Sequence, residues 1–487
     1  MRISKIILAT VLASATAAGA AAQNMPAPLA PVTIMAPIVT ERHGVFNGKI
    51  VGYRAFVEPF DTTNSDGTPA ARLATISYVA RQADPKRPIL FVFNGGPIAP
   101  SAILHMGAFG PKRVAVPDDV TAPPTAFELV DNPYTVLDVA DIVFFDPAGT
   151  GLSRFAPGTD PKSQFSIHAD ARQLVQLVLA WTKAHGRSGA PVYLLGESYG
   201  TLRAPEAAAQ LAAAGAAPAG VILLGQAVNI VEYSQRRLNI VSYAVSLPTL
   251  AAIAWWHQKA DRKGRDFDAF IKDAQAFGGG AYLSALFAGD TATVQQREAV
   301  ATRLQEFTGI GADYWRSHAL RMTKVEYQRL LFPGKLLATN DARYIGPPEG
   351  ENPFDRIPTT YETVFARYLA SDLRAGMLGV YSNVSPAPAT FAGWDWGPGT
   401  SPFGDWPYGQ AISDLMATQP GFRVFVANGY YDTQTTIGAM DYLVSQSGWP
   451  RDRVRTAYYQ GGHMAYTNEA SLKRFTDDVR AMITRKW

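Results

Sequence analysis

The chain has 487 residues, which is enough for one large domain with an insertion or for two domains. Hydrophobic residues make up 47% and charged residues 17%, a composition typical of a packed globular protein and not of a disordered one. Lys and Arg number 44 against 41 Asp and Glu, so the charge gives no basis for binding nucleic acid or an anionic membrane.

The N-terminal stretch MRISKIILATVLASATAAGAAAQ has the parts of a secretory signal peptide. Arg2 and Lys5 supply the charged end, an apolar run follows, and Ala20–Ala22 form a small-residue cleavage site. The run is too short for a membrane anchor, and no later stretch is long and apolar enough to span a bilayer. We therefore predict a signal peptide over residues 1–22 and an exported protein, periplasmic or secreted.

The chain contains no cysteine, which excludes disulfides, thiolate metal sites, a cysteine nucleophile and a lipidated cysteine. No cluster of side chains suggests a metal or a cofactor, and we expect neither. An exported chain without disulfides has to be stabilised by burial, for which this length suffices.

A Pro/Ala-rich linker is predicted over residues 23–40. Two alternating segments then predict a β-hairpin, IVGYRAFVEPF and ARLATISYVAR. Further apolar segments, each suited to a buried parallel strand, are RPILFVFNGG, VADIVFFDPAGTG, APVYLLGES, AGVILLG, GFRVFVANG and RVRTAYYQGG. Helical stretches separate them, so we predict an α/β fold with a mostly parallel sheet covered by helices on both faces.

Residues 228–391 interrupt this alternation with segments of helical periodicity and no clear strands. We interpret them as a mainly helical cap inserted into a sheet domain formed by residues 41–227 and 392–487. The Trp-, Gly- and Pro-rich stretch TFAGWDWGPGTSPFGDWPYG is too irregular for a helix and predicts a loop that returns the chain to the sheet.

The stretch from Gly196 to Gly200, GESYG, fits the nucleophile elbow pattern with Ser198 at its centre. A serine on a sharp strand-to-helix turn needs small neighbours, because the strained backbone leaves no room for side chains there. The apolar strand before the motif and the Ala-rich helix after it are the context that this motif requires.

A serine hydroxyl becomes nucleophilic when a base takes its proton, and in this arrangement the acid and the histidine follow the serine in the chain. Of the seven histidines, His463 alone lies beyond the last predicted strands. Asp432 ends the preceding strand, whereas Asp414 and Asp441 are expected in helices and are weaker choices. The order and context predict a triad of Ser198, Asp432 and His463.

Acyl transfer also needs donors for the oxyanion. The backbone N–H of Tyr199, directly after the nucleophile, is one expected donor, and Gly96 N–H in FVFNGGPIAP is the other.

In five ordered blocks the chain resembles the serine carboxypeptidase family, a branch of the α/β-hydrolases. The blocks are Asn94-Gly95-Gly96-Pro97 with Gly110-Pro111, NPYTVLDVADIVFFDPAGTGLSR, Gly196 to Gly200 with Pro205, NGYYD and GGHM. The resemblance implies the α/β-hydrolase fold and peptide hydrolysis, and the missing cysteines suggest a bacterial, exported member.

The resemblance also implies a role for the acid beside the serine. In this family the Glu before the nucleophile and the Asn of the oxyanion block bind the substrate's C-terminal carboxylate, which here are Glu197 and Asn94. An ionised Glu197 would repel a carboxylate, so it has to be protonated, and activity should fall as rising pH removes that proton.

Several family positions differ in this chain. Val92 replaces the usual Trp, Ile98-Ala99-Pro100 replaces Gly-Cys-Ser, and Ala108 stands where a second carboxylate-binding acid is expected. These differences touch the carboxylate site and leave the triad intact.

We therefore predict a serine-type carboxypeptidase whose substrate is a peptide. An esterase or acyltransferase with the same triad, acting on a small-molecule ester, and a non-catalytic scaffold remain alternatives. Arg203 either faces a substrate carboxylate or makes structural hydrogen bonds. Five tryptophans of the cap and the return loop either line an acyl pocket or pack in the core, namely Trp255, Trp256, Trp394, Trp396 and Trp406. The sequence does not indicate an oligomeric state.

Overall fold

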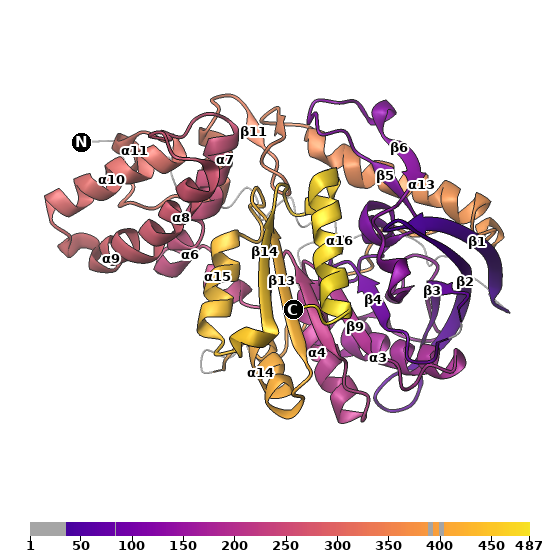
Figure 1. Cartoon of the computed structure of the whole chain (residues 1–487). Helices are drawn as coiled ribbons and strands as arrows, with labels where there is room; N and C mark the ends of the chain where they lie inside the picture. The colour runs from indigo at the N-terminus through magenta and orange to yellow at the C-terminus, as the bar shows by residue number, and fades with distance from the viewer. Residues whose placement is uncertain (1–35, 83, 388–392, 399–403) are drawn as a thin grey trace. The chain divides into compact units, whose positions relative to one another are not determined.

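The computed structural model describes residues 36–82, 84–387, 393–398 and 404–487. In these ranges ten strands form a central sheet that is parallel from β7 to β14 and antiparallel at the opposite edge (Figure 1). In spatial order its strands are β1 (Ile38–Phe46), β2 (Lys49–Thr63), β3 (Pro69–Ala80), β7 (Asp141–Phe144), β4 (Ile89–Phe93), β9 (Val192–Glu197), β10 (Gly220–Leu224), β13 (Arg423–Gly429) and β14 (Val454–Tyr459), with β8 (Arg154–Phe155) paired to β3. The predicted α/β class with a mostly parallel sheet is confirmed.

The central strands are mainly apolar because both of their faces are covered. Every residue of β4, β9 and β10 is buried. The edge strand β1 instead has many exposed side chains, as expected where one face meets solvent. It begins at Ile38, so the predicted linker over residues 23–40 was wrong in its last three residues, which pair with β2.

Alternate strand residues face different helices. Phe91, Leu194 and Val424 belong to one buried cluster with apolar side chains of the helices α3 (Ile167–Ala184), α4 (Gly200–Ala213), α14 (Tyr408–Thr418) and α15 (Ile437–Gln446). Phe425, of opposite parity to Val424, contacts Phe475 of α16 (Glu469–Ile483). The helices therefore cover both faces of the sheet.

The segment predicted as a cap is mainly helical. Its helices are α5 (Ile230–Tyr233), α6 (Ile240–Ala244), α7 (Leu247–Trp256), α8 (Phe267–Phe277), α9 (Leu283–Ala288), α10 (Val294–Thr308), α11 (Ala312–Ser317), α12 (Lys324–Leu330) and α13 (Arg356–Ser371). Helices α6 to α11 share a second apolar cluster, to which Tyr327 and Leu337 also belong. The division into catalytic domain and cap remains a prediction, because residues 34–487 form one compact unit.

Two features of this segment differ from the expectation. Short strands β11 (Leu336–Leu337) and β12 (Ile345–Gly346) form a small antiparallel pair within it. Helix α13 does not share the cap's apolar cluster but packs against α2 (Ala102–Leu104) and the π-helical turn His105–Phe109. A further antiparallel pair, β5 (Lys112–Ala115) and β6 (Glu128–Asp131), follows that turn.

The carboxyl ends of parallel strands meet at one edge of the sheet, and the candidate triad lies there. Ser198 directly follows β9, Asp432 lies three residues after β13, and His463 lies four residues after β14. In the ranges that the structure describes, no helix is long and apolar enough to cross a membrane, and no group of acidic, His or Cys residues could hold a metal ion. The predicted signal peptide, residues 1–22, lies outside the described residues.

Candidate active site

The backbone at Ser198 has the strained geometry of a nucleophile elbow. Its φ angle is +58°, a left-handed conformation that a serine rarely adopts. A Cβ on Gly196 would stand 2.1 Å from the carbonyl oxygen of Gly200, so a side chain cannot be placed there without moving the turn. The Ser198 N–H donates to Leu224 O at 2.9 Å, which ties the turn to β10.

His463 and Asp432 form a buried pair. Nδ1 of His463 lies 2.7 Å from Oδ2 of Asp432. The other oxygen, Oδ1, accepts the backbone N–H groups of Gln434 and Thr435, and the Thr435 hydroxyl donates to Oδ2. These bonds fix the carboxylate, which in turn orients the imidazole with Nδ1–H as donor and leaves Nε2 free to accept a proton.

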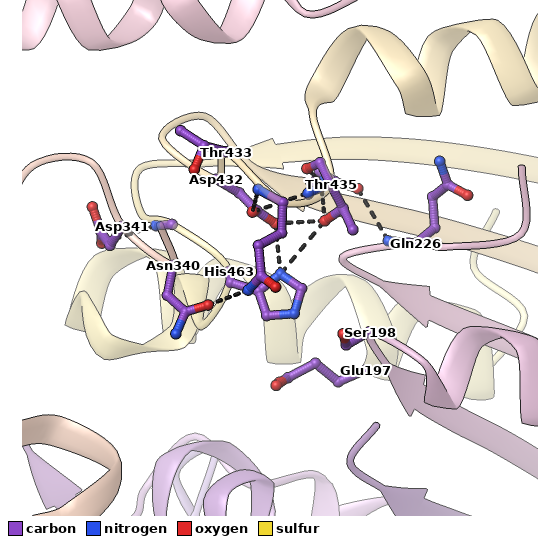
Figure 2. Close-up of polar contacts among 12 residues, drawn as sticks. Glu197, Ser198, Gln226, Asn340, Asp341, Asp432, Thr433, Thr435 and His463 are labelled. Atoms are coloured by element: carbon purple, nitrogen blue, oxygen red, sulfur yellow. Dashed lines mark hydrogen bonds and ion pairs between the residues drawn. The ribbon is translucent and has the colours of Figure 1, made fainter. Parts of the chain in front are cut away.

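Ser198 and Asp432 lie on opposite sides of the His463 imidazole (Figure 2). Backbone contacts agree with this view. Gly225 directly follows Leu224, whose carbonyl accepts the hydrogen bond from the Ser198 N–H. A Cβ on Gly225 would stand 3.0 Å from Cε1 of His463 and 3.1 Å from Nδ1. The nucleophile and the base are thus brought to the same point of the sheet edge.

The loop that carries His463 is held by residues of the predicted cap. The His463 N–H donates to the carbonyl of Asn340, and Gly462 N–H donates to the carboxylate of Asp341. Arg343 pairs with Asp341 at 2.6 Å, so that carboxylate is compensated although it is buried. These supports lie more than 100 residues from the histidine in the chain, and sequence reasoning missed them.

The turn that holds Gly96 lies against the elbow. A Cβ on Gly95 would stand 2.7 Å from Tyr199 N and 2.9 Å from Ser198 Cβ, so only a glycine permits this approach. Gly96 has a φ of +109°. Among the described residues neither Gly96 N–H nor Tyr199 N–H donates to another protein group, which leaves both predicted oxyanion donors free.

Arg203 fixes the start of this turn from inside the protein. Its side chain is fully buried, donates to Asn94 O at 2.7 Å and pairs with Asp170 at 2.8 Å. Of the two alternatives for Arg203, the structure therefore favours structural hydrogen bonds over contact with substrate.

Glu197 and Asn94 contact each other beside the nucleophile. Asn94 Nδ2 donates to Oε1 of Glu197 at 3.1 Å, and the Tyr466 hydroxyl donates to Oε2 at 2.7 Å. Burial raises the pKa of Glu197 to about 7, although the charge of His463 and these two hydrogen bonds act in the opposite direction. A large share of Glu197 therefore carries a proton in mildly acidic to neutral solution.

The pKa of His463 is shifted as well. Burial lowers it, but the charge of Asp432 and the hydrogen bond to that carboxylate outweigh burial and raise the pKa to about 9, with the Glu197 charge adding to the rise. Since ionised Glu197 favours the imidazolium, neutral Glu197 favours the neutral imidazole that a general base needs.

Sequence reasoning also missed two polar groups close to the candidate triad. Tyr466 lies three residues after His463 on the same loop, and this spacing was the one local signal for it. Thr435 follows Asp432 by three residues and donates to it. Of the tryptophans considered for an acyl pocket, Trp394 is buried in the core. Its ring and that of Tyr199 pack in a T-shaped, edge-to-face arrangement.

The sheet topology and the position of the strand-end site are those of the α/β-hydrolase fold. A comparison with protein-family models matches residues 76–225 to the serine carboxypeptidase family. This range runs from β3 to the residue after β10 and contains Asn94, Gly96 and Ser198. The match covers 150 of the 487 residues and shows a similarity to this family over the sheet segment that carries the elbow.

The comparison with solved structures gave matches at low sequence identity, and the first of these shares the fold. A prohormone-processing carboxypeptidase of Saccharomyces cerevisiae, Kex1(delta)p, matches with a TM-score of 0.54 and 13% identity over 90% of this chain and 92% of that one. A proline iminopeptidase of Mycobacterium smegmatis matches at 0.37, with 13% identity over 88% and 98% of the two chains. A carboxyl esterase of Bacillus coagulans matches at 0.38, with 12% identity and the same coverage. A comparison with curated protein sequences gave no match.

Proposed function

We propose that this protein is a serine-type carboxypeptidase that releases C-terminal residues from peptides through an acyl-enzyme on Ser198. The observation that carries the proposal is the buried carboxyl of Glu197, next to the nucleophile and held by Asn94 and Tyr466. An uncharged acid at this place can donate a hydrogen bond to a substrate carboxylate one residue beyond the scissile bond.

In the proposed first step, Ser198 Oγ attacks the scissile carbonyl while Nε2 of His463 takes the hydroxyl proton. The oxyanion accepts from the N–H groups of Gly96 and Tyr199. The C–N bond then breaks, and His463 gives its proton to the leaving amine. The acyl group remains on Ser198 as an ester.

In the second step, His463 takes a proton from water, whose oxygen attacks the ester carbonyl. The C–O bond to Ser198 breaks, and the proton returns to the serine oxygen. Asp432 orients His463 and stabilises the imidazolium that forms in each half of the reaction.

An esterase acting on small-molecule esters is the second candidate. Ala108 is fully buried and offers no acid, so the carboxylate site has one carboxyl group where the family resemblance implies two. With Asn94 Oδ1 occupied by Leu104 N–H, the donors for a substrate carboxylate come from Glu197 and the remaining amide proton of Asn94.

A matched pair of peptides, one with a free C-terminus and one C-terminally amidated, tests the proposal. A carboxypeptidase should release the last residue of the free acid and lose most of its kcat/KM on the amide. An esterase should ignore both peptides and hydrolyse an activated ester. The Ser198→Ala variant should be inactive in every assay.

Export by the predicted signal peptide is part of the same proposal. N-terminal sequencing of protein recovered from the periplasm or medium should find a mature chain that begins near residue 23. A mature chain that begins at Met1 would contradict it.

A further inference from the structure

We propose that Lys324 binds a carboxylate of the peptide substrate, which makes this cap residue a determinant of specificity. The inference rests on the proposed peptidase function and extends it to the substrate class, peptides with an acidic group close to the scissile bond. It starts from the place of Lys324, the first residue of α12, next to the loop of the candidate catalytic aspartate.

The ammonium group lies at the triad loop. Nζ of Lys324 donates to the carbonyl of Gln434 at 2.9 Å, and the Gln434 N–H donates to Oδ1 of Asp432. The ammonium also lies 5.4 Å from the centre of the Tyr233 ring. The Tyr233 hydroxyl donates to Gln226 O, one residue after Gly225, where an added Cβ would stand 3.0 Å from His463.

Within the described part of the chain no acidic group lies at ion-pair distance from this ammonium, although the charge of Asp432 acts on it from further away and raises its pKa against the larger effect of burial. Lys324 forms no ion pair there, and the carboxylate oxygens of Asp432 are occupied by His463, Gln434 and Thr435. One of the three N–H donors of Lys324 is used, so the others remain free at a partly buried position. Burial also lowers the pKa of Lys324 to about 8.

The position is unfavourable for a cation in the free protein. The first turn of a helix carries a positive partial charge, which disfavours a lysine there. A partly desolvated cation at a helix start, without an acidic group in direct contact, costs stability unless an anion binds to it. A carboxylate bound beside the triad would supply that anion, and the two free N–H donors would bond to it.

A purely structural role is the alternative, in which the bond to Gln434 O attaches α12 to the triad loop. The two roles differ in what they do to selectivity. Loss of a structural bond lowers activity on all substrates alike, whereas loss of a carboxylate-binding cation lowers it on acidic substrates alone.

The experiment compares three substrate pairs on wild-type protein, Lys324→Met and Lys324→Arg. The pairs are N-acylated dipeptides with Glu or Gln as penultimate residue, with Glu or Gln as last residue, and with a free or amidated C-terminus. We expect wild type to favour the Glu member of one of the first two pairs by about tenfold in kcat/KM, the ratio to fall to about one in Lys324→Met, and Lys324→Arg to retain most of it. The free-acid and amide pair reports the Glu197 site, and its ratio should stay the same in both variants. The affected pair identifies which carboxylate is bound.

Lys335→Met is the matched control, since Lys335 is exposed in the same cap and its substitution should leave every ratio unchanged. Ratios that are equal in wild type and Lys324→Met for both Glu and Gln pairs would overturn the proposal. Binding of the same dipeptides to Ser198→Ala, measured by calorimetry, gives the same comparison without turnover. Failure of the peptidase proposal would appear as absent hydrolysis, and failure of the Lys324 proposal as absent selectivity in binding.

Discussion

The hydroxyl of Tyr466 donates a hydrogen bond of 2.7 Å to the carboxyl group of Glu197, the residue directly before the candidate nucleophile. Tyr466 lies on the loop of His463, so one loop supplies both the proposed base and a partner of the buried acid. The protonation of Glu197 is thereby linked to the position of the histidine loop.

Removing the Tyr466 hydroxyl should move the loss of activity at alkaline pH to a higher pH. Its hydrogen bond stabilises the ionised form of Glu197, so Tyr466→Phe should raise the pKa of that carboxyl further. The pH at which KM for a free-acid peptide begins to rise should therefore increase by about one pH unit. Tyr361→Phe is the control, because the buried Tyr361 hydroxyl has no hydrogen-bond partner within the described ranges. An equal shift in both variants would contradict the account.

Glu197→Gln should abolish the increase of KM at alkaline pH. Wild-type Glu197 loses its proton as pH rises through about 7, after which its charge repels a substrate carboxylate. Glutamine stays neutral, so KM should remain flat from pH 6 to 8.5. The charge of Glu197 also helps to raise the pKa of His463, so the acidic limb of kcat/KM should move to lower pH in this variant. Glu206→Gln, on the helix after the elbow, should leave the whole profile unchanged.

Asp432→Asn should reduce kcat by about 10⁴-fold near neutral pH. An amide cannot hold the Nδ1–H tautomer as the carboxylate does, and it cannot stabilise the imidazolium. Asp414→Asn is the comparison, since Asp414 is exposed on α14 and bonded to Gln410. Steady-state kinetics on one peptide suffices, and similar losses in both variants would exclude Asp432 as the partner of His463.

Arg203→Met should destabilise the protein by about 3–5 kcal/mol, because it leaves Asp170 buried and unpaired. Combining it with Asp170→Leu removes the uncompensated charge and should restore a large part of the loss. Chemical denaturation at pH 7 measures both effects. If the double variant were no more stable than Arg203→Met, the buried pair would not be the source of the stability.

The sequence was sufficient for features that depend on local pattern. The apolar strands, the glycine spacing around Ser198 and the order of the serine, the aspartate and the histidine all lie in short segments with clear signals. The contacts of Asn340 and Asp341 with the His463 loop, and of Arg203 with Asp170, join segments that the fold alone brings together. Helix α13 was assigned to the cap for the same reason, since helical periodicity does not state what a helix packs against.

The assignment of Ser198 as the nucleophile is tested most directly by a fluorophosphonate probe followed by peptide mapping. The account predicts one adduct, on the peptide that contains Ser198, absent from Ser198→Ala and formed far more slowly in His463→Ala. An adduct on another residue, or no labelling of a folded wild-type protein, would contradict it.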